Sequence, residues 1–295
     1  MKSKSTFSLN WGGNVKAKPT VLFPKNIQGL KSVINKKNFI PAGNQRSFGD
    51  NSVNSKLIIS MKNFNDFIKF DKKKGIIEVQ SGVILKDILD MIIKNGWFIP
   101  VTPGTKYVSV GGMIANNVHG KNTLENQIKY HIKEIKLLLT NKKIIFCSPK
   151  KNRKIFDLTV GGFGLTGFIL SAKIKLKKIS SNFIDQKIVE FKNYNEFFFL
   201  LKKNKKYEYN VSWIDNFKAG KIKGLCYYGN HSKEKKLDDN DLLPNEKRIN
   251  FISFTVLKIF TQNYYLVKIT KFFFRKLKKI SYKKKSSIND FFYPQ

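Results

Sequence analysis

The sequence predicts an α+β fold, because the expected strands and helices interleave without the regular repeat of a parallel α/β protein. Residues 83–94 predict an amphipathic helix that ends at Gly96. The apolar face of this helix consists of Leu85, Ile88, Leu89, Ile92 and Ile93. Within residues 168–178, the apolar Ala172, Ile174 and Leu176 alternate with lysines, which is the period of a half-buried strand. With 295 residues, the chain is long enough to bury two cores.

Shorter apolar runs between turn signals predict the remaining elements of the first half. A further helix is expected over residues 26–37. Strands, the first of them buried, are expected over residues 39–40, 57–59, 76–80, 132–140 and 143–147. The long strand ends near Ser180 and Ser181, so we place the domain boundary there. The first domain then covers residues 1–180 and the second covers residues 181–295.

The chain is strongly basic, since 56 Lys and Arg residues against 20 Asp and Glu residues give a formal net charge of +36. Base recognition favours the bidentate fork of arginine, and arginine occurs only at Arg46, Arg153, Arg248 and Arg275. We therefore interpret the lysines as solvated surface and expect no nucleic-acid partner. Residues 251–285 interleave aromatic rings with lysines, which suits either a membrane-surface segment or an ordinary helix with a basic outer face.

Signals for targeting and for metal binding are weak in this sequence. The amino-terminal residues lack the apolar region of a secretory signal, and no apolar run is long enough to span a membrane. We therefore expect a cytoplasmic protein, peripheral at the inner membrane if residues 251–285 bind lipid. Cys147 and Cys226 stand apart without a CxxC pair, so neither a disulfide nor a metal site is expected.

Residues 103–122 contain the most informative motif of the chain. Four glycines and a proline interrupt an apolar pattern there, and bare backbone lets a bulky ligand approach closely. The same segment holds His119 and Lys121, which can move a proton or hold an anion. The alternative is a tight turn whose histidine merely caps a strand.

Two other glycine-rich loops accompany this motif. Residues 41–51 follow a strand and offer backbone N–H groups beside Arg46, which suits a diphosphate. Residues 161–167 contain a GxGxxG pattern, but a Rossmann site needs a helix directly after its glycines. The alternating strand of residues 168–178 follows instead, so a nicotinamide-binding Rossmann fold is disfavoured.

In this order, the motifs resemble the flavin-binding domain of the vanillyl-alcohol oxidase superfamily, and within it the decaprenylphosphoryl-β-D-ribose 2′-oxidase-like family. The matching segments are residues 45–51, 103–105, 110–112, 117–122, 161–167, 212–215 and 291–294. The resemblance implies a PCMH-type FAD-binding domain of two subdomains, followed by an α+β substrate domain that is incomplete at its carboxyl end.

The resemblance also implies which residues hold FAD. They are Gly43, Asn44, Gln45, Arg46, Ser47, Phe48, Gly49, Asp50, Asn51, Gly104, Ser109, Val110, Gly111, Gly112, Asn116, Asn117, His119, Gly164, Gly167 and Ile169. Many members of the superfamily attach FAD covalently through a histidine of the first loop. Arg46 stands at that place here, and a guanidinium cannot form the bond, so we expect FAD to be bound non-covalently.

The expected chemistry is the oxidation of a secondary alcohol, which needs a hydride acceptor and a group that takes the hydroxyl proton. His119 is expected to take that proton, and Lys121 to hold a substrate phosphate or, if buried, to act as a base. Tyr293 of the terminal motif is expected to contact the substrate together with His119 and Lys121. The structural alternative is that His119 and Lys121 merely line the flavin ring.

The resemblance implies 2′-oxidation of a polyprenylphosphoryl pentose, as one half of an epimerisation that a short-chain reductase completes. A sugar-1,4-lactone oxidase is the alternative in the same superfamily, and a non-enzymatic basic protein for anionic lipid or RNA is the alternative of another class. The sequence stops at Gln295, where family members continue. We expect either a truncated product or one piece of a split enzyme, poorly soluble alone because of unpaired strand edges.

Overall fold

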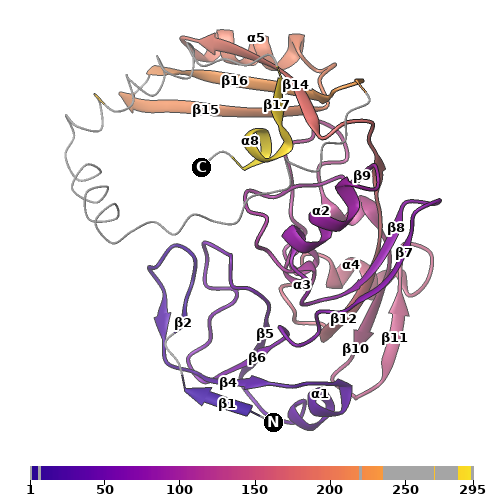
Figure 1. The fold of residues 1–295 in the computed structure, drawn as a ribbon. Coiled ribbons are helices and arrows are strands. Elements are labelled where there is room, and N and C mark those ends of the chain that lie inside the picture. The colour runs from indigo at the N-terminus through magenta and orange to yellow at the C-terminus, as the bar shows by residue number, and fades with distance from the viewer. Residues whose placement is uncertain (1, 6–7, 219–220, 235–268, 270–284, 294–295) are drawn as a thin grey trace. The chain divides into compact units, whose positions relative to one another are not determined.

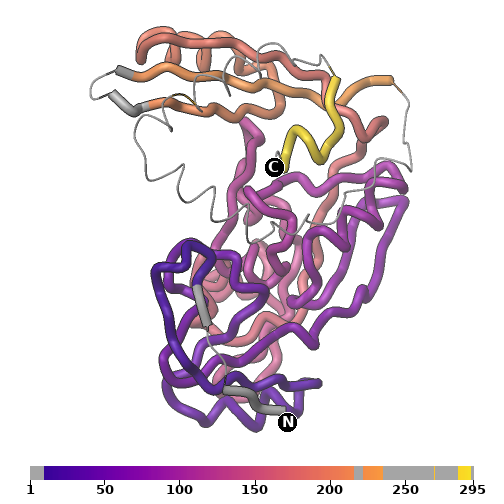
Figure 2. The backbone as a smooth tube through the Cα atoms, turned by 60° about the vertical axis from the view of Figure 1, so that its left-hand side comes forward, coloured from indigo at the N-terminus to yellow at the C-terminus, as the bar shows by residue number. Residues whose placement is uncertain are grey.

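The computed structural model describes residues 2–5, 8–218, 221–234, 269 and 285–293 (Figures 1 and 2). The chain divides into two compact units. Unit 1 comprises Met1–Lys121 and Glu125–Ile179. Unit 2 comprises Ser180–Gln295 together with the short segment Asn122–Leu124. The predicted membrane-surface segment of residues 251–285 lies outside the described residues, except for residues 269 and 285.

The first sheet of unit 1 has four strands in the order β1-β4-β6-β5. These strands are β1 (Lys2–Ser5), β4 (Thr20–Phe23), β6 (Leu57–Ser60) and β5 (Phe39–Ala42). β6 pairs in parallel with both β4 and β5, and β1 pairs antiparallel with β4. Helix α1 (Ile27–Val33) connects β4 to β5 and begins at Asn26, whose Oδ1 accepts from the Gly29 N–H at 2.9 Å.

The second sheet of unit 1 is antiparallel, with five strands in the order β11-β10-β12-β8-β7. They are β11 (Ile144–Cys147), β10 (Ile132–Leu138), β12 (Phe168–Lys175), β8 (Ile76–Gln80) and β7 (Phe67–Asp71). The accompanying helices are α2 (Leu85–Ile93), α3 (Val110–Ala115), α4 (Arg153–Thr159) and the short 3-10 helix η1 (Ile128–His131). Two small ribbons complete the unit, β2 (Ser8–Leu9) with β3 (Lys16–Ala17) and β9 (Trp97–Phe98) with β13 (Lys177–Lys178).

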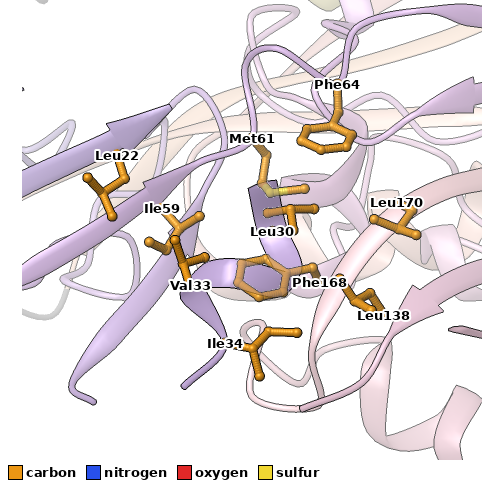
Figure 3. Packing of buried hydrophobic residues seen from close by; sticks show 10 residues of the cluster. All are labelled: Leu22, Leu30, Val33, Ile34, Ile59, Met61, Phe64, Leu138, Phe168 and Leu170. Carbon is orange, nitrogen blue, oxygen red and sulfur yellow. The ribbon is translucent and has the colours of Figure 1, made fainter. Parts of the chain in front are cut away.

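A buried cluster joins the two sheets of unit 1 across helix α1 (Figure 3). Leu30 and Val33 of α1 pack with Ile59 of the first sheet and Phe168 of the second. The Phe168 ring also stacks on Phe39, with 5.6 Å between the ring centroids. The strand that carries Phe168 also follows the third glycine-rich loop, so this core fixes where that loop ends.

Unit 2 contains an antiparallel sheet in the order β15-β16-β14-β17. Its strands are β15 (Tyr209–Lys218), β16 (Lys221–His231), β14 (Phe183–Phe191) and β17 (Lys285–Ser287). Figure 1 shows α5 (Tyr194–Lys203) on one face of this sheet and α8 (Ile288–Phe292) on the other. Tyr209 meets Phe292 edge to face on the α8 side, with 4.8 Å between centroids.

The α+β class and the main elements expected from the sequence are confirmed. The helix expected over residues 83–94 is α2, and its predicted apolar face is buried. The helix expected over residues 26–37 stops at Val33, because the polar residues that follow turn back through Asn38, which has φ +57°. β5 is longer than the expected strand, and Phe39 and Ile40 are half-buried rather than buried. Among the described residues, no helix is long and apolar enough to cross a membrane.

The core of unit 1 can be tested with matched leucine truncations. Leu30 is fully buried, so Leu30→Ala should lower the free energy of unfolding by about 2–5 kcal/mol through lost burial and a cavity. Leu165 is 85% exposed, so Leu165→Ala should change it by less than about 0.5 kcal/mol. Urea denaturation followed by circular dichroism measures both values. Equal losses in the two variants would contradict the packing described here.

Candidate functional site

The first glycine-rich loop lies directly against the segment that precedes α3. A Cβ atom on Gly43 would come within 1.9 Å of Ser109 Oγ, so only glycine fits there. Beside it, Asn44 Nδ2 donates to the Tyr107 carbonyl at 2.7 Å. Ser109 is also the N-cap of α3, where its Oγ accepts from the Gly112 N–H at 3.3 Å. The same serine thus holds both the helix start and the loop.

The third loop packs on the other end of α3. The N–H groups of Gly161 and Phe163 donate to the carbonyls of Ile114 and Ala115, at 3.0 Å and 2.9 Å. A Cβ atom on Gly164 would lie 2.8 Å from Cγ of Pro41, the first residue of the first loop. The structure therefore brings the three glycine-rich loops together around one short helix, although more than a hundred residues separate the first from the last.

The glycines of this region serve different purposes. A Cβ on Gly111 would lie 2.9 Å from Ser81 Cβ, and one on Gly167 would lie 2.3 Å from the Leu138 carbonyl oxygen, so both are needed for internal packing. Gly104 is different, because no atom of the described residues lies within 4 Å of where its Cβ would be. Its bare backbone faces open space, which leaves room for a ligand.

Backbone donors are distributed unevenly over the first loop and the start of α3. The N–H groups of Val110 and Gly111 donate to the carbonyls of Val83 and Ser81, at 2.9 Å and 2.7 Å, so the start of α3 has no spare donors there. In the first loop, within the part of the chain that the structure describes, several N–H groups have no protein acceptor. These belong to Asn44, Arg46, Ser47, Phe48 and Gly49. The first loop is therefore the natural anion site.

Arg46 lies between two aromatic rings in this loop. Its guanidinium carbon is 4.6 Å from the centroid of Trp11 and 5.6 Å from that of Tyr107. Trp11 is itself bound to the loop, because its backbone N–H donates to the Ser47 carbonyl at 2.9 Å. Arg46 Nε is buried without a hydrogen-bond partner among the described residues. The rings thus fix a positive charge that still has a donor to offer.

Several buried oxygens of unit 1 also lack partners within the described ranges. They are Asn51 Oδ1, Ser52 Oγ, Ser81 Oγ and Thr102 Oγ1. The Asn51 amide meanwhile donates from Nδ2 to Asn116 Oδ1 at 2.6 Å, which ties the first loop to the end of α3. Buried polar atoms without partners cost about 1–3 kcal/mol each, so a polar ligand that reached them would stabilise this part of the protein.

His119 and Lys121 lie on a hairpin that leaves the end of α3. It starts at Asn117, which has φ +41°, and is closed by hydrogen bonds from Ile128 N to Val118 O at 2.9 Å and from Gly120 N to Asn126 O at 3.0 Å. The His119 side chain is exposed, whereas Lys121 is half-buried. Burial lowers the pKa of Lys121 from 10.5 to about 8. Lys121 therefore remains mostly protonated at neutral pH.

The tip of this hairpin, Asn122–Leu124, belongs to unit 2. Thr123 donates from its N–H to the Glu208 carbonyl and from Oγ1 to the Tyr207 carbonyl, both at 2.8 Å. Tyr293 also belongs to unit 2, where it is buried beside Phe292, with 6.5 Å between the ring centroids. Burial raises the pKa of Tyr293, so its hydroxyl stays protonated.

The roles of the remaining residues expected to hold FAD stay predictions. Ile169 is buried on β12 in register with Leu137. Trp11, Ser52, Ser81, Thr102 and Tyr107 were not expected from the sequence. Trp11 stands before a Gly-Gly pair, which is a weak turn signal. Tyr107 lies within the motif of residues 103–122, whereas Ser52, Ser81 and Thr102 carry no motif and are found only through their neighbours in space.

Residues 19–148 match the family model of the FAD binding domain. These residues contain the first two glycine-rich loops, whereas the third loop and Trp11 lie outside the matched range. The chain accordingly carries an FAD-binding domain, and the unpaired donors of the first loop fit the diphosphate of this cofactor.

Several curated proteins are similar to this chain. Decaprenylphosphoryl-beta-D-ribose oxidase of Mycolicibacterium smegmatis is 36% identical over 140 residues, which cover 46% of this chain and 30% of that protein. A putative D-arabinono-1,4-lactone oxidase of Neurospora crassa is 23% identical over 171 residues, covering 56% and 31%. L-gulonolactone oxidase of Bos taurus is 23% identical over 172 residues, covering 56% and 39%. The matches thus span about a third of the length of these relatives.

Gly104 offers a test of FAD binding that leaves the fold intact. A methyl group there meets no protein atom, so Gly104→Ala should keep the thermal stability of the apoprotein. It should weaken FAD binding by tenfold or more, about 1.4 kcal/mol, because the methyl enters the space we assign to the cofactor. Fluorescence titration with FAD measures this change. Gly29→Ala in α1 is the matched control and should keep the affinity, so equal effects of the two substitutions would refute the assignment.

Proposed function

We propose, from the premise that this chain belongs to the PCMH-type FAD-binding oxidoreductases of the vanillyl-alcohol oxidase superfamily, that it oxidises a secondary alcohol of a sugar. We further propose that the sugar is a polyprenylphosphoryl pentose, oxidised at its 2′ position. The observation that carries the proposal is the hairpin of residues 117–128, because it leaves the cofactor loops with an exposed imidazole and a half-buried ammonium two residues apart.

The residues of the first loop supply the binding of the cofactor. Its unpaired backbone N–H groups and the stacked Arg46 would hold the FAD diphosphate without a covalent bond. Gly104 would let the cofactor pass close to the backbone. When bound, FAD supplies the hydride acceptor. Release of the flavin by denaturation would agree with non-covalent attachment.

His119 and Lys121 take different roles in this proposal. The exposed imidazole of His119 accepts the proton of the reacting hydroxyl. The ammonium of Lys121, charged at neutral pH, pairs with the phosphate that links the sugar to its lipid. Tyr293 is proposed as a further contact of the substrate. A separate short-chain reductase would reduce the keto sugar and finish an epimerisation at the inner membrane surface.

A sugar-1,4-lactone oxidase is the second candidate. It is favoured by the likeness to the lactone oxidases of Neurospora crassa and Bos taurus, which covers 56% of this chain. The two candidates differ in the charge of the substrate. An aldonolactone carries no phosphate, and Lys121 would then have no anion to bind. A non-enzymatic basic protein is the third candidate, and its salt-sensitive binding would survive the loss of both His119 and Lys121.

Anaerobic reduction of the bound flavin separates these candidates. A polyprenylphosphoryl pentose in detergent should bleach the visible absorbance of the flavin, and a soluble aldonolactone should leave it unchanged. His119→Gln should slow the bleaching by about 10²- to 10⁴-fold while the flavin spectrum is retained. His131→Gln is the matched control, since His131 Nε2 lies 3.1 Å from the Glu125 carbonyl oxygen and His131 has no role in the proposed reaction, and it should react as the wild type does. Bleaching by the lactone alone would favour the second candidate.

The pH dependence tests the role of Lys121. Its pKa in the free protein is about 8, so raising the pH through this value removes the positive charge. If the ammonium binds the substrate phosphate, kcat/KM should fall as the pH rises through about 8. Lys121→Arg should lose this falling limb, because an arginine stays charged. A limb that instead rises through the same range would identify the neutral amine as a base.

A further inference from the structure

Helix α5 presents an unusual outer surface on unit 2. Its inner side packs on the sheet through the half-buried Phe197 and Leu200, and the Phe197 ring lies 4.9 Å from that of Phe191 on β14. On the outer side, Tyr194, Phe198 and Phe199 are 51%, 55% and 60% exposed. No residue of this helix is fully buried. The sheet therefore covers one side of α5 and leaves three aromatic rings in water.

The exposed rings and the neighbouring lysines form one continuous surface. Tyr194, Phe198 and Lys202 follow each other at steps of four residues, so they lie along one line of the helix. Phe199 and Lys203 form the adjacent line, and Lys203 Nζ lies 5.4 Å from the centroid of the Phe199 ring. We define the α5 face as Tyr194, Phe198, Phe199, Lys202, Lys203 and Lys206.

The charge of this surface has one sign. Residues 197–206 contain four lysines and no acidic residue. Glu196, the acidic residue of α5, is occupied at the start of the helix, where its carboxylate accepts from the Lys192 N–H at 2.8 Å and from Asn193 Nδ2 at 3.3 Å. The α5 face thus combines apolar rings with uncompensated positive charge.

We propose that the α5 face docks on an anionic phospholipid bilayer, an inference that rests on the proposed function for its purpose, the delivery of a lipid-linked sugar. Aromatic rings favour the headgroup region of a bilayer, where each can leave water without entering the hydrocarbon core completely. Lysines near an anionic surface each contribute about 1 kcal/mol to binding. Charge complementarity therefore selects an anionic bilayer over a neutral one, and the rings select a bilayer over a dissolved polyanion.

Co-sedimentation with vesicles tests this proposal on the full chain loaded with FAD. The vesicles consist of phosphatidylcholine alone or mixed with phosphatidylglycerol. The wild type should bind the mixed vesicles at least tenfold more tightly than the neutral ones. A double variant that carries Phe198→Ser and Phe199→Ser should bind the mixed vesicles more than tenfold more weakly than the wild type. A second double variant, with Lys202→Gln and Lys203→Gln, should bind the mixed vesicles about thirtyfold more weakly. It should also lose the preference for anionic lipid.

The matched control makes the same kinds of substitution in unit 1, on strand β7 and the turn that follows it. Ile68 on β7 is 50% exposed and is followed by the exposed Lys72 and Lys73. Ile68→Ser combined with Lys72→Gln and Lys73→Gln should change vesicle binding less than twofold. An equal loss in this control would overturn the proposal, because it would show binding by net charge alone. Full vesicle binding by the two α5 variants, or binding of RNA in preference to vesicles, would overturn it as well.

The flavin separates this proposal from the proposed function. All variants should keep the absorbance spectrum of the bound flavin. With detergent-dispersed substrate, their flavin should be reduced at the wild-type rate, because α5 carries no residue of the reaction. Vesicle binding without any reduction of the flavin by the substrate would support the α5 face and refute the oxidase. Reduction of the flavin by the substrate, with unaltered vesicle binding in the α5 variants, would support the oxidase and refute the α5 face.

Discussion

The contact between Gly43 and Ser109 holds the candidate site together. A side chain at position 43 would collide with Ser109 Oγ, and the same oxygen caps α3 through the Gly112 N–H. The first loop can therefore lie flat on the start of the helix, while the third loop occupies its end through Ile114 and Ala115. Three segments that are distant in sequence become the walls of one site because a single six-residue helix lies among them.

The division of labour between the loops follows from where their hydrogen bonds go. At the start of α3, the N–H groups already donate to the carbonyls of Ser81 and Val83. This segment can therefore contact a ligand by close packing but cannot donate these hydrogen bonds to it. The first loop leaves its N–H groups unpaired and adds the charge of Arg46, held between Trp11 and Tyr107. Anion binding and close approach are thus separate properties of neighbouring segments, and an FAD molecule needs both, for its diphosphate and for its flat rings.

The sequence predicted the elements with strong periodicity and the loops with unusual composition. The apolar face of α2 and the alternation in β12 are local patterns, so they could be interpreted without a partner. Gly111 and Gly167 were expected to hold FAD, and the structure adds that a Cβ at either position would meet protein atoms, Ser81 Cβ or the Leu138 carbonyl oxygen. Ser52, Ser81 and Thr102 were missed because an unpaired buried oxygen is a property of the surroundings and leaves no signature in the chain.

The buried oxygens of Asn51, Ser52, Ser81 and Thr102 that lack partners affect the stability of the protein in a cell. Each of them weakens the native state until something polar reaches it, so occupancy and folding become a single equilibrium. A hundredfold excess of flavin over its dissociation constant would add about 2.7 kcal/mol to the native state. Riboflavin supply would then govern how long each newly made copy survives quality control, quite apart from whether it ever turns over a sugar.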